Sequence, residues 1–334
     1  MTPGITVIIP IYNSERTIAK CLDGLVLQDY PRSRLDVLIL DGGSTDESIR
    51  IIKSYLKKLN LRVIHAGFKD NMEGRRIIGY QRAKFGFICV LDSDNYLLSP
   101  DWMSRMVKPL LENPSIVSSF TLHYQYLSTQ TPFNRYVALF GGHDPVSYYL
   151  KKTDRLKWTD NNWTRPWQIV SQQPGYTVVH FTAADFPTLG SNGAIIRKKF
   201  IKYRNIPIES FFHTDILYDA LTDGHDLHAV VDVPVVHDTG STIINNIKKR
   251  VEYMSLHHQK LSKHRRYLVF NSRSESDVFN LIKFIVYTVT IVRPLSESLA
   301  GYIKIRDIAW FLHPIACWLF LLGYGYAVIT NNIK

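Results

Sequence analysis

Residues 87–95 read Phe-Ile-Cys-Val-Leu-Asp-Ser-Asp-Asn, an apolar run that ends in two carboxylates one residue apart. The apolar part predicts a buried strand of a sheet that is covered on both faces. Alternate positions at a strand end can bring Asp92 and Asp94 to one divalent cation, and Mg²⁺ and Mn²⁺ prefer such oxygen ligands. The pair is therefore a candidate cation site. The alternative is that both aspartates only cap the turn at 96–101.

The segments around this run alternate in character through the first hundred residues. Short runs of β-branched and aliphatic residues alternate with amphipathic stretches, which predicts an α/β fold with a largely parallel sheet. Ligands of such sheets bind beyond the carboxyl ends of the strands. The expected strands are 5–9, 36–40, 61–64, 87–91, 190–197 and 229–236, and the expected helices are 14–27, 46–59, 74–84 and 211–222.

The composition excludes several classes of protein. The chain has 334 residues, 46% of them hydrophobic, which excludes disordered and fibrous proteins. Three widely spaced cysteines form neither a disulfide framework nor a Cys-x-x-Cys site. The net charge is +11, and residues 248–273 hold eight basic side chains against the single acid Glu252. A strongly apolar region follows, so we expect an anionic membrane surface as the partner and no nucleic acid.

The C-terminal region contains the membrane signal. Residues 308–329 run for 22 positions without a charged side chain, which is long enough to cross a bilayer as a helix. The stretches 278–292 and 295–305 are typical of interfacial or tilted helices, and the number of crossings stays open. The N-terminus lacks the pattern of a signal peptide, so we expect a cell-membrane protein whose catalytic part faces the cytoplasm.

These patterns predict four parts of the chain. The first is the α/β domain, within which an aromatic-rich insertion interrupts the alternation; a basic juxtamembrane segment and membrane-associated helices follow. Their expected bounds are 1–240 for the domain, 121–188 for the insertion, 241–275 for the basic segment and 276–334 for the helices.

A second polar cluster follows the expected strand at 36–40. Asp41 is left at the strand end to accept hydrogen bonds from a base or ribose. Gly42 and Gly43 allow a sharp turn, and Thr45 or Asp46 can cap the next helix. The chain has neither a P-loop nor a Gly-x-Gly-x-x-Gly fingerprint, which counts against nucleotide hydrolases and dinucleotide oxidoreductases.

Three motifs in order resemble the nucleotide-sugar half of family-2 inverting glycosyltransferases with the GT-A fold. They are Val-Ile-Ile-Pro-Ile-Tyr-Asn-x-Glu at 7–15, Asp-Gly-Gly-Ser-Thr-Asp-x-Ser at 41–48 and Asp-Ser-Asp at 92–94. The resemblance implies that a nucleoside pocket, a diphosphate site and a Mn²⁺ or Mg²⁺ site lie side by side. It assigns Pro10, Tyr12, Glu15 and Asp41 to the nucleoside, Arg76 to the diphosphate, Asp92 and Ser93 to the sugar-diphosphate, and Asp92 and Asp94 to the metal. A solvated helix arginine is the alternative for Arg76.

The acceptor half resembles the family more loosely. Gly190, Ser191, Asn192 and Gly193 match its acceptor side, and the glycines would allow a ligand to approach the backbone closely. The resemblance implies that Asp215 is the catalytic base, although this chain has His-Thr-Asp where Thr-Glu-Asp is usual. A helix N-terminal acid is the alternative. His237 matches an imidazole offered to the metal or diphosphate in many GT-A enzymes, and a satisfied strand-end histidine is its alternative.

The order of a GT-A domain, a basic segment and apolar helices is similar to archaeal membrane-bound family-2 mannosyltransferases, a reduced cellulose-synthase plan. The resemblance implies transfer of a hexose, first of all mannose from GDP-mannose, to a dolichyl- or polyprenyl-linked acceptor in N-glycan biosynthesis. A Gln-x-x-Arg-Trp motif is not clearly present, which speaks against a processive polymerase. Two alternatives stay open: a polyprenyl-phosphate glycosyltransferase that acts on the phosphate, and a non-catalytic membrane-bound subunit.

Overall fold

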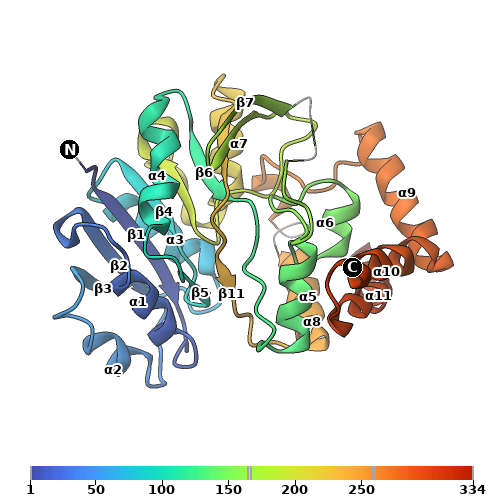
Figure 1. Cartoon of the computed structure of the whole chain (residues 1–334), viewed down its shortest axis with the longest axis horizontal. Helices are drawn as coiled ribbons and strands as arrows, with labels where there is room; N and C mark the ends of the chain where they lie inside the picture. The colour runs from blue at the N-terminus through green and yellow to red at the C-terminus, as the bar shows by residue number, and fades with distance from the viewer. Residues whose placement is uncertain (1, 164, 166–167, 257–260, 333–334) are drawn as a thin grey trace. The chain divides into compact units, whose positions relative to one another are not determined.

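A computed structural model describes residues 2–163, 165, 168–256 and 261–332 (Figure 1). The chain divides into two compact units. The α/β unit consists of Met1–His123, Trp163–Ala183 and Leu189–Asp238, and the helical unit of Tyr124–Asn162, Ala184–Thr188 and Thr239–Lys334. The segment 121–188, predicted as one insertion, is thus divided between both units.

The α/β unit is built on a nine-stranded mixed sheet in the order β3-β2-β1-β4-β9-β6-β10-β8-β7. β1, β2, β3 and β4 run parallel, whereas β9 lies antiparallel between β4 and β6. β5 and β11 form a separate antiparallel pair. The strands are β1 (Ile5–Ile11), β2 (Leu35–Asp41), β3 (Leu61–His65), β4 (Phe87–Val90), β5 (Asn95–Tyr96), β6 (Ser118–Thr121), β7 (Ile169–Gln173), β8 (Tyr176–His180), β9 (Ala194–Arg197), β10 (Leu227–Val231) and β11 (Val236–His237).

The register of the parallel strands brings the predicted motifs to one edge of the sheet. Ile11 of β1 lies opposite Asp41 of β2, and Ile8 lies opposite Val90 of β4. Every residue of these three strands is buried, as continuous apolar runs predict for strands covered on both faces. The polar residues that follow each strand therefore gather at the carboxyl edge. The α/β fold and its first seven elements are confirmed.

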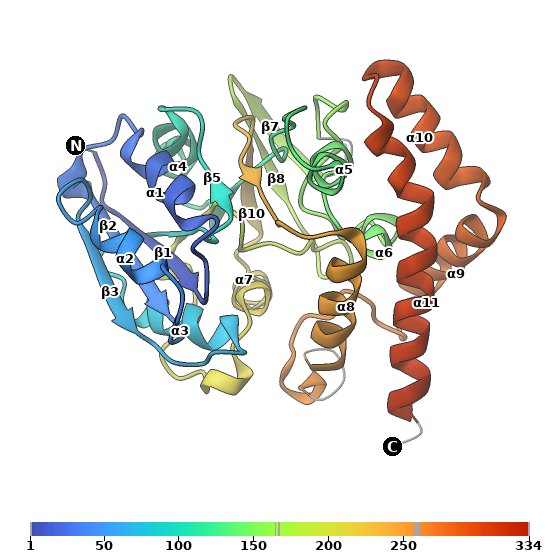
Figure 2. The ribbon, with the colours of Figure 1, turned by 90° about the horizontal axis from the view of Figure 1, so that it is seen from below.

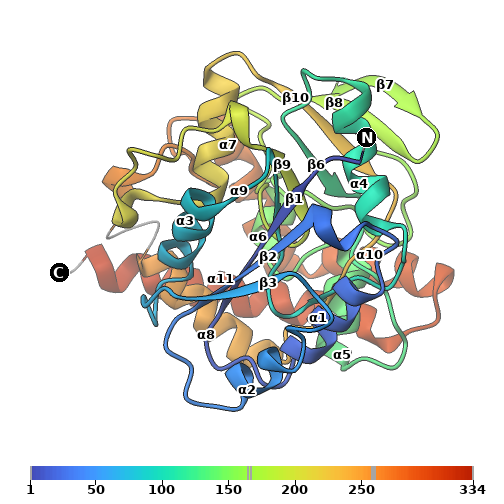
Figure 3. The same cartoon turned by 90° about the vertical axis from the view of Figure 1, so that its left-hand side faces the viewer.

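Helices cover both faces of the sheet. Figures 2 and 3 show α3 and α7 on one face and α1 and α4 on the other. α1 begins later than expected, because residues 15–17 form a turn, and α2 is shorter, because residues 54–58 form turns. The elements are α1 (Ile18–Val26), α2 (Ser48–Lys53), α3 (Met72–Arg82), α4 (Trp102–Glu112), α7 (His213–Thr222) and the 3₁₀ helices η1 (Arg32–Arg34), η3 (Lys198–Phe200) and η4 (Ile208–Ser210).

Several features of the sheet differ from the sequence prediction. β9 begins at Ala194, later than the expected strand 190–197, because Gly190, Asn192 and Gly193 have positive φ angles that a strand does not have. The hairpin β7–β8 joins the main sheet from within the predicted insertion, and its turn contains Gly175 at φ +85°. The expected strand 229–236 is broken into β10 and β11. Pro234 lies in the break, where a residue without an amide hydrogen cannot continue a ladder of hydrogen bonds.

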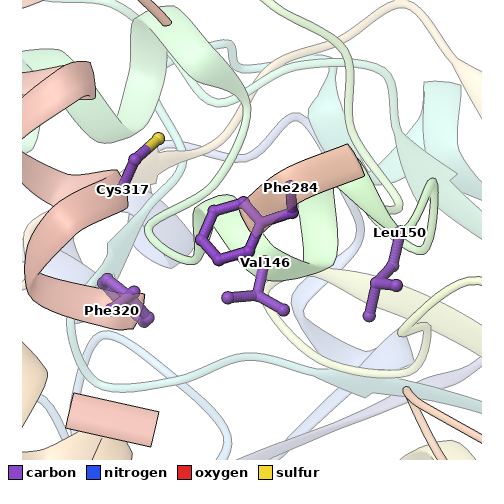
Figure 4. Packing of buried hydrophobic residues seen from close by; sticks show 5 residues of the cluster. All are labelled: Val146, Leu150, Phe284, Cys317 and Phe320. Atoms are coloured by element: carbon purple, nitrogen blue, oxygen red, sulfur yellow. The ribbon is translucent and has the colours of Figure 1, made fainter. Parts of the chain in front are cut away.

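The helical unit packs its helices around a small apolar core. α11 contacts α6, α8, α9 and α10 (Figure 2). Figure 4 shows the core, in which Val146 and Leu150 meet Phe284 of α9 and Cys317 and Phe320 of α11. The elements are α5 (Pro132–Phe140), α6 (Pro145–Tyr149), α8 (Ile243–Tyr253), α9 (Glu275–Thr290), α10 (Val292–Lys304), α11 (Leu312–Asn332), η6 (Ser262–His264) and η7 (Ile308–Phe311).

One helical segment among the described residues, Ile308–Thr330, is long and apolar enough to cross a membrane, with a mean hydropathy of 1.6. α9 and α10 meet at an angle of 79° at Ile291, which has a φ of +61°. The C-terminal apolar helix is thus confirmed, and contact with a membrane stays a prediction. Lys260, part of the basic stretch, lies outside the described residues.

Candidate active site

The loops that follow β1 and β2 are held together by reciprocal hydrogen bonds. The side-chain oxygen of Asn13 accepts the amide hydrogen of Thr45 (2.9 Å). The Asp46 carboxylate accepts the amide hydrogen of Glu15 (3.0 Å), and the Glu15 carboxylate accepts that of Glu47 (3.0 Å). Asn13 has a φ of +47°, which asparagine tolerates better than most residues. Glu15, predicted to bind the nucleotide, therefore also closes this loop pair.

Asp41 lies at the end of β2, as predicted, and is 5% exposed. One of its carboxylate oxygens accepts hydrogen bonds from the amide (2.9 Å) and the hydroxyl (2.7 Å) of Ser44. Burial raises the pKa of Asp41, but the hydrogen bonds from Ser44 outweigh it and hold the pKa below its usual value. A fixed anionic acceptor thus lies at the strand end, which suits a ribose hydroxyl.

The other two predicted nucleoside residues differ in exposure. Tyr12 is partly exposed just after β1, and the ammonium group of Lys69 lies 5.3 Å from the centre of its ring. This distance is typical of a cation–π contact. Pro10 is buried within β1, so its side chain contributes to the sheet interior.

The Asp-Ser-Asp motif follows β4 in a turn. The amide of Asp92 donates to the side-chain oxygen of Asn95 (3.0 Å), and the Ser93 hydroxyl donates to the hydroxyl of Ser14 (3.1 Å). Asp94 lies 3.5 Å from Nε2 of His237. The β5–β11 pairing produces this contact, because His237 lies opposite Asn95. The structure therefore brings two of the three predicted metal ligands together.

The third predicted ligand, Asp92, is bound by Arg76. One nitrogen of the Arg76 guanidinium donates to both carboxylate oxygens of Asp92, at 2.7 and 2.9 Å. The Arg76 side chain is only 4% exposed, so the solvated-arginine alternative is wrong. Such a charge-assisted pair fixes the direction of the Asp92 carboxylate and neutralises it. Arg76 thus contacts the Asp-Ser-Asp motif directly.

Asp215 lies in the first turn of α7 and is fully buried. The hydroxyl of the preceding residue, Thr214, donates to the carbonyl of Leu189 (3.0 Å). The residue before that, His213, contacts Glu73 of α3 through both its amide and its ring. Burial raises the pKa of Glu73, but the charges of His213 and Arg76 outweigh it and hold the pKa well below its usual value. Sequence reasoning missed Glu73, because nothing local links it to a residue 140 positions away.

The predicted acceptor-side glycines pack against the protein itself. A Cβ on Gly190 would lie 2.9 Å from the carbonyl oxygen of His213, and one on Gly193 would lie 2.9 Å from the ring of Trp102. Both have positive φ angles, +104° and +90°. Both positions thus need glycine because the His213 carbonyl and the Trp102 ring pack closely against their backbone. The role of Gly190 and Gly193 toward a ligand, with Ser191 and Asn192 between them, stays a prediction.

Asp238 organises the same edge of the sheet, and sequence reasoning missed it. Its carboxylate accepts hydrogen bonds from Arg16 (2.9 Å) and from the hydroxyl of Tyr96 (2.8 Å). Its amide donates to the carbonyl of Asp94 (2.8 Å). Asp238 therefore fixes the backbone on either side of the contact between Asp94 and His237. The only feature of the sequence that could have indicated a role for Asp238 is its position directly after His237.

The residues at this edge supply part of the ligand set that a divalent cation needs. Asp94, 29% exposed, supplies carboxylate oxygens and His237 supplies an imidazole nitrogen, a combination that suits Mn²⁺ better than Mg²⁺. No group of three His, Cys, Asp or Glu residues within the described ranges could hold a metal ion. A cation bound here would therefore take further oxygen ligands from a diphosphate or water.

A family model for Glycosyl transferase family 2 matches residues 6–185, more than half of the chain. The chain belongs to glycosyl transferase family 2. The match includes the three strand-end motifs and both carboxylates of Asp-Ser-Asp. The resemblance inferred from these motifs is confirmed.

Relatives and a solved structure agree with this assignment. Poly(ribitol-phosphate) beta-N-acetylglucosaminyltransferase TarS of Staphylococcus aureus is 36% identical over 93 residues, 28% of this chain and 16% of that protein. A Methanococcus voltae dolichyl N-acetyl-alpha-D-glucosaminyl phosphate 3-beta-D-2,3-diacetamido-2,3-dideoxy-beta-D-glucuronosyltransferase is 45% identical over 60 residues, 18% of this chain and 19% of that protein. This chain thus spans less than a fifth of either relative.

The structural comparison covers nearly the whole chain. The structure of mannosyltransferase PcManGT from Pyrobaculum calidifontis, in complex with GDP-Man and Mn²⁺, matches with a TM-score of 0.57 and 14% identity. The match covers 98% of this chain and 88% of that one. At this identity the likeness shows the fold, and the GT-A prediction is confirmed.

Proposed function

We propose that this glycosyltransferase transfers a hexose, first of all mannose from GDP-mannose, with inversion to a hydroxyl of a dolichyl- or polyprenyl-linked glycan, with Mn²⁺ or Mg²⁺ as cofactor. The observation that carries the proposal is the cluster at the carboxyl edge, where Arg76 binds Asp92 and His237 faces Asp94. The donor in the PcManGT complex and the dolichyl-linked substrate in the name of the Methanococcus voltae relative support the choice of donor and acceptor.

The reaction is a single displacement at the anomeric carbon. An acceptor hydroxyl oxygen forms the new bond to that carbon while the bond to the diphosphate oxygen breaks, and the electron pair of the broken bond leaves with the diphosphate. Asp215 takes the hydroxyl proton as general base. Attack opposite to the leaving group inverts the configuration.

The remaining residues bind and orient the donor. Asp41 accepts hydrogen bonds from the nucleoside, and Tyr12 offers its ring to the base. Asp94 and His237 would hold the cation. A bound divalent cation supplies positive charge that stabilises the departing diphosphate. Arg76 fixes the direction of the Asp92 carboxylate and offsets its charge, so that Asp92 repels the diphosphate less.

The full burial of Asp215 favours a second candidate, transfer to the phosphate of a polyprenyl phosphate. An acceptor that is a phosphate carries its nucleophile already deprotonated and hardly needs a base. Under this second proposal Asp215 would be an acid at the start of α7 that stabilises the helix dipole.

One experiment tests both candidates. Detergent-solubilised protein is given GDP- and UDP-sugars with and without Mn²⁺, and with either dolichyl phosphate or dolichyl-linked glycans as acceptor. We expect release of GDP from GDP-mannose that requires the metal and the glycan acceptor. We further expect the Asp215→Asn variant to lose about 10²- to 10⁴-fold in kcat, as removal of a general base does.

The control is Asp223→Asn, an exposed carboxylate at the end of the same helix. Should Asp215→Asn transfer sugar to dolichyl phosphate at the wild-type rate, the phosphate acceptor is the correct one. Absence of nucleoside diphosphate release from every donor contradicts both candidates.

A further inference from the structure

The N-terminus of α7 lacks a cap of its own. The residue at the N-cap position is Phe212, which makes no side-chain capping hydrogen bond. The first amides of a helix have no partner within the helix, and a buried helix start needs an acceptor from elsewhere. The first three residues of α7 are all buried. Whatever satisfies this helix start therefore also fixes Asp215, its third residue.

Glu73 of α3 supplies that acceptor. One carboxylate oxygen of Glu73 accepts the backbone amide hydrogen of His213 (2.9 Å), and the other lies 2.8 Å from Nδ1 of the His213 ring. Glu73 is itself 2% exposed. An anion at a helix N-terminus is also stabilised by the helix dipole. A buried carboxylate from one helix thus caps another helix and holds its first side chain.

The same carboxylate connects to the donor side of the site. Glu73 forms an ion pair with Arg76, and Arg76 binds both oxygens of Asp92. A chain of charged contacts therefore runs from the Asp-Ser-Asp motif through α3 to the start of α7. Its members are all at least four-fifths buried, so solvent screens these contacts little.

A second contact limits how α7 can move. Gly190, in the segment before β9, lies against the carbonyl oxygen of His213: a Cβ added to Gly190 would be only 2.9 Å from that oxygen. This segment therefore packs tightly on the helix start. The hydroxyl of Thr214 donates to the carbonyl of Leu189 in the same segment. Glu73 and this segment hold the helix start through different groups. Arg76 meets the helix start both through Glu73 and directly, because one of its guanidinium nitrogens lies 3.1 Å from Nδ1 of His213.

We infer that Glu73 is a positioning residue, which caps α7 from α3 and sets the distance between the base Asp215 and the donor-binding Asp92. The inference rests on the proposed role of Asp215 as base. His213 is the partner that this chain carries where the family motif usually has another residue. It binds Glu73 through its ring as well as its amide.

The experiment compares Glu73→Ala and Glu73→Gln with the matched control Glu209→Gln, an exposed carboxylate in η4 just before α7. We measure kcat, the donor KM and the amide hydrogen exchange of residues 213–217 in the full chain. In Glu73→Ala we expect faster exchange in this segment and a kcat about 10- to 100-fold lower, because small displacements of a base have effects of this size. The donor KM should change less than about threefold, because Arg76 keeps its bonds to Asp92.

Glu73→Gln retains an oxygen for the His213 amide and the same shape, so its kcat should lie between those of Glu73→Ala and wild type. It also carries the test if Glu73→Ala does not fold. Exchange of residues 213–217 in Glu73→Ala equal to that of wild type and Glu209→Gln overturns the inference. If Glu73→Ala does not fold, a wild-type kcat in Glu73→Gln overturns it. So does a donor KM that rises while kcat is unchanged, since Glu73 would then serve only the donor side.

Failure of the proposed function is a separate result. If wild-type protein transfers no sugar from any donor, the proposed function is wrong. The exchange comparison needs no substrate and still decides whether Glu73 orders the start of α7.

Discussion

Both units of this chain bury charged side chains, but the surroundings of these charges differ. In the α/β unit, Arg76 and Asp92 meet at the carboxyl edge of a sheet whose strands are entirely buried. In the helical unit, Arg135 pairs with Asp307 (2.8 Å) between α5 and the segment before η7. The first pair lies at the edge of a sheet where ligands of α/β folds commonly bind, whereas the second joins two segments of the helical unit.

The second point of the comparison is the apolar surface of α9 in the helical unit. Large apolar side chains such as Phe279, Val286 and Val289 of α9 are more than half exposed. Exposed apolar surface of this kind marks contact with a membrane or another protein. From this comparison we predict that the α/β unit carries the proposed chemistry and that the helical unit contacts lipid. Four predictions test this division, and they are ordered by the expected free energy change.

The largest effect is expected at the sheet edge. Asp94→Ala removes the carboxylate that faces His237, and we expect kcat/KM for metal-dependent transfer to fall about 10³-fold, or about 4 kcal/mol in transition-state stabilisation. Nucleotide-induced thermal stabilisation in the presence of Mn²⁺ should disappear. The control is Asp101→Ala, an exposed aspartate in the next turn. Loss of stability without loss of donor binding would favour the turn-capping alternative for these aspartates.

The second effect concerns packing beside the same edge. Gly193→Ala places a methyl group 2.9 Å from the Trp102 ring at a φ of +90°, and we expect the free energy of unfolding to fall by about 1–3 kcal/mol. Gly86→Ala is the matched control, because a Cβ there meets nothing within 4 Å. Denaturant titration of both variants measures the difference. Equal stabilities would mean that the segment relaxes freely, as a ligand-facing loop does.

The third prediction uses a buried histidine of the sheet interior. Nδ1 of His228 shares a hydrogen bond with the hydroxyl of Ser118 (2.8 Å). Burial lowers the pKa of His228 to about 3. The unfolded chain takes up this proton near pH 6.5, so stability is greatest above that pH and falls as the pH decreases toward 3. We expect a loss of about 2 kcal/mol in unfolding free energy between pH 6.5 and pH 5 from this residue. His228→Gln should show a correspondingly smaller slope, and parallel slopes would disprove the assignment.

The smallest effect is expected on the helical unit. In lipid vesicles, Phe279→Cys should react with a water-soluble maleimide about tenfold more slowly than Ser54→Cys, just after α2, although both positions are exposed in the protein alone. The three native cysteines are buried and should contribute little background. Equal reaction rates would show that α9 stays in water, and lipid contact would then be confined to other segments.

Much of the fold could be predicted because its signals are local. The fully buried strands β1, β2 and β4 are continuous apolar runs, and the residues that follow them carry the family motifs. The hairpin β7–β8 was missed because its first strand, Ile169–Gln173, lies at the sheet edge, is mostly polar and shows no alternation. Pro234, which breaks the expected strand at 229–236, is a local signal against one continuous strand, because proline cannot donate a hydrogen bond to the ladder.

The candidate site was predictable only in part, for a related reason. Asp41, Asp92 and Asp94 could be recognised from what stands next to them in sequence. The partners of the site could not, since Glu73 lies 140 residues from His213 and Arg16 lies 222 residues from Asp238. Such contacts depend on how elements pack, which no local pattern records.

The hydrogen bonds between the loops after β1 and β2 have a consequence for the thermodynamics of donor binding. Asn13, Glu15 and Asp46 satisfy the backbone amides of the facing loop without any ligand. Ordering a flexible residue costs about 1–2 kcal/mol of conformational entropy, and these loops have already incurred that cost on folding. A nucleotide that binds over them meets a preorganised surface, so its binding should cost little further conformational entropy in these loops.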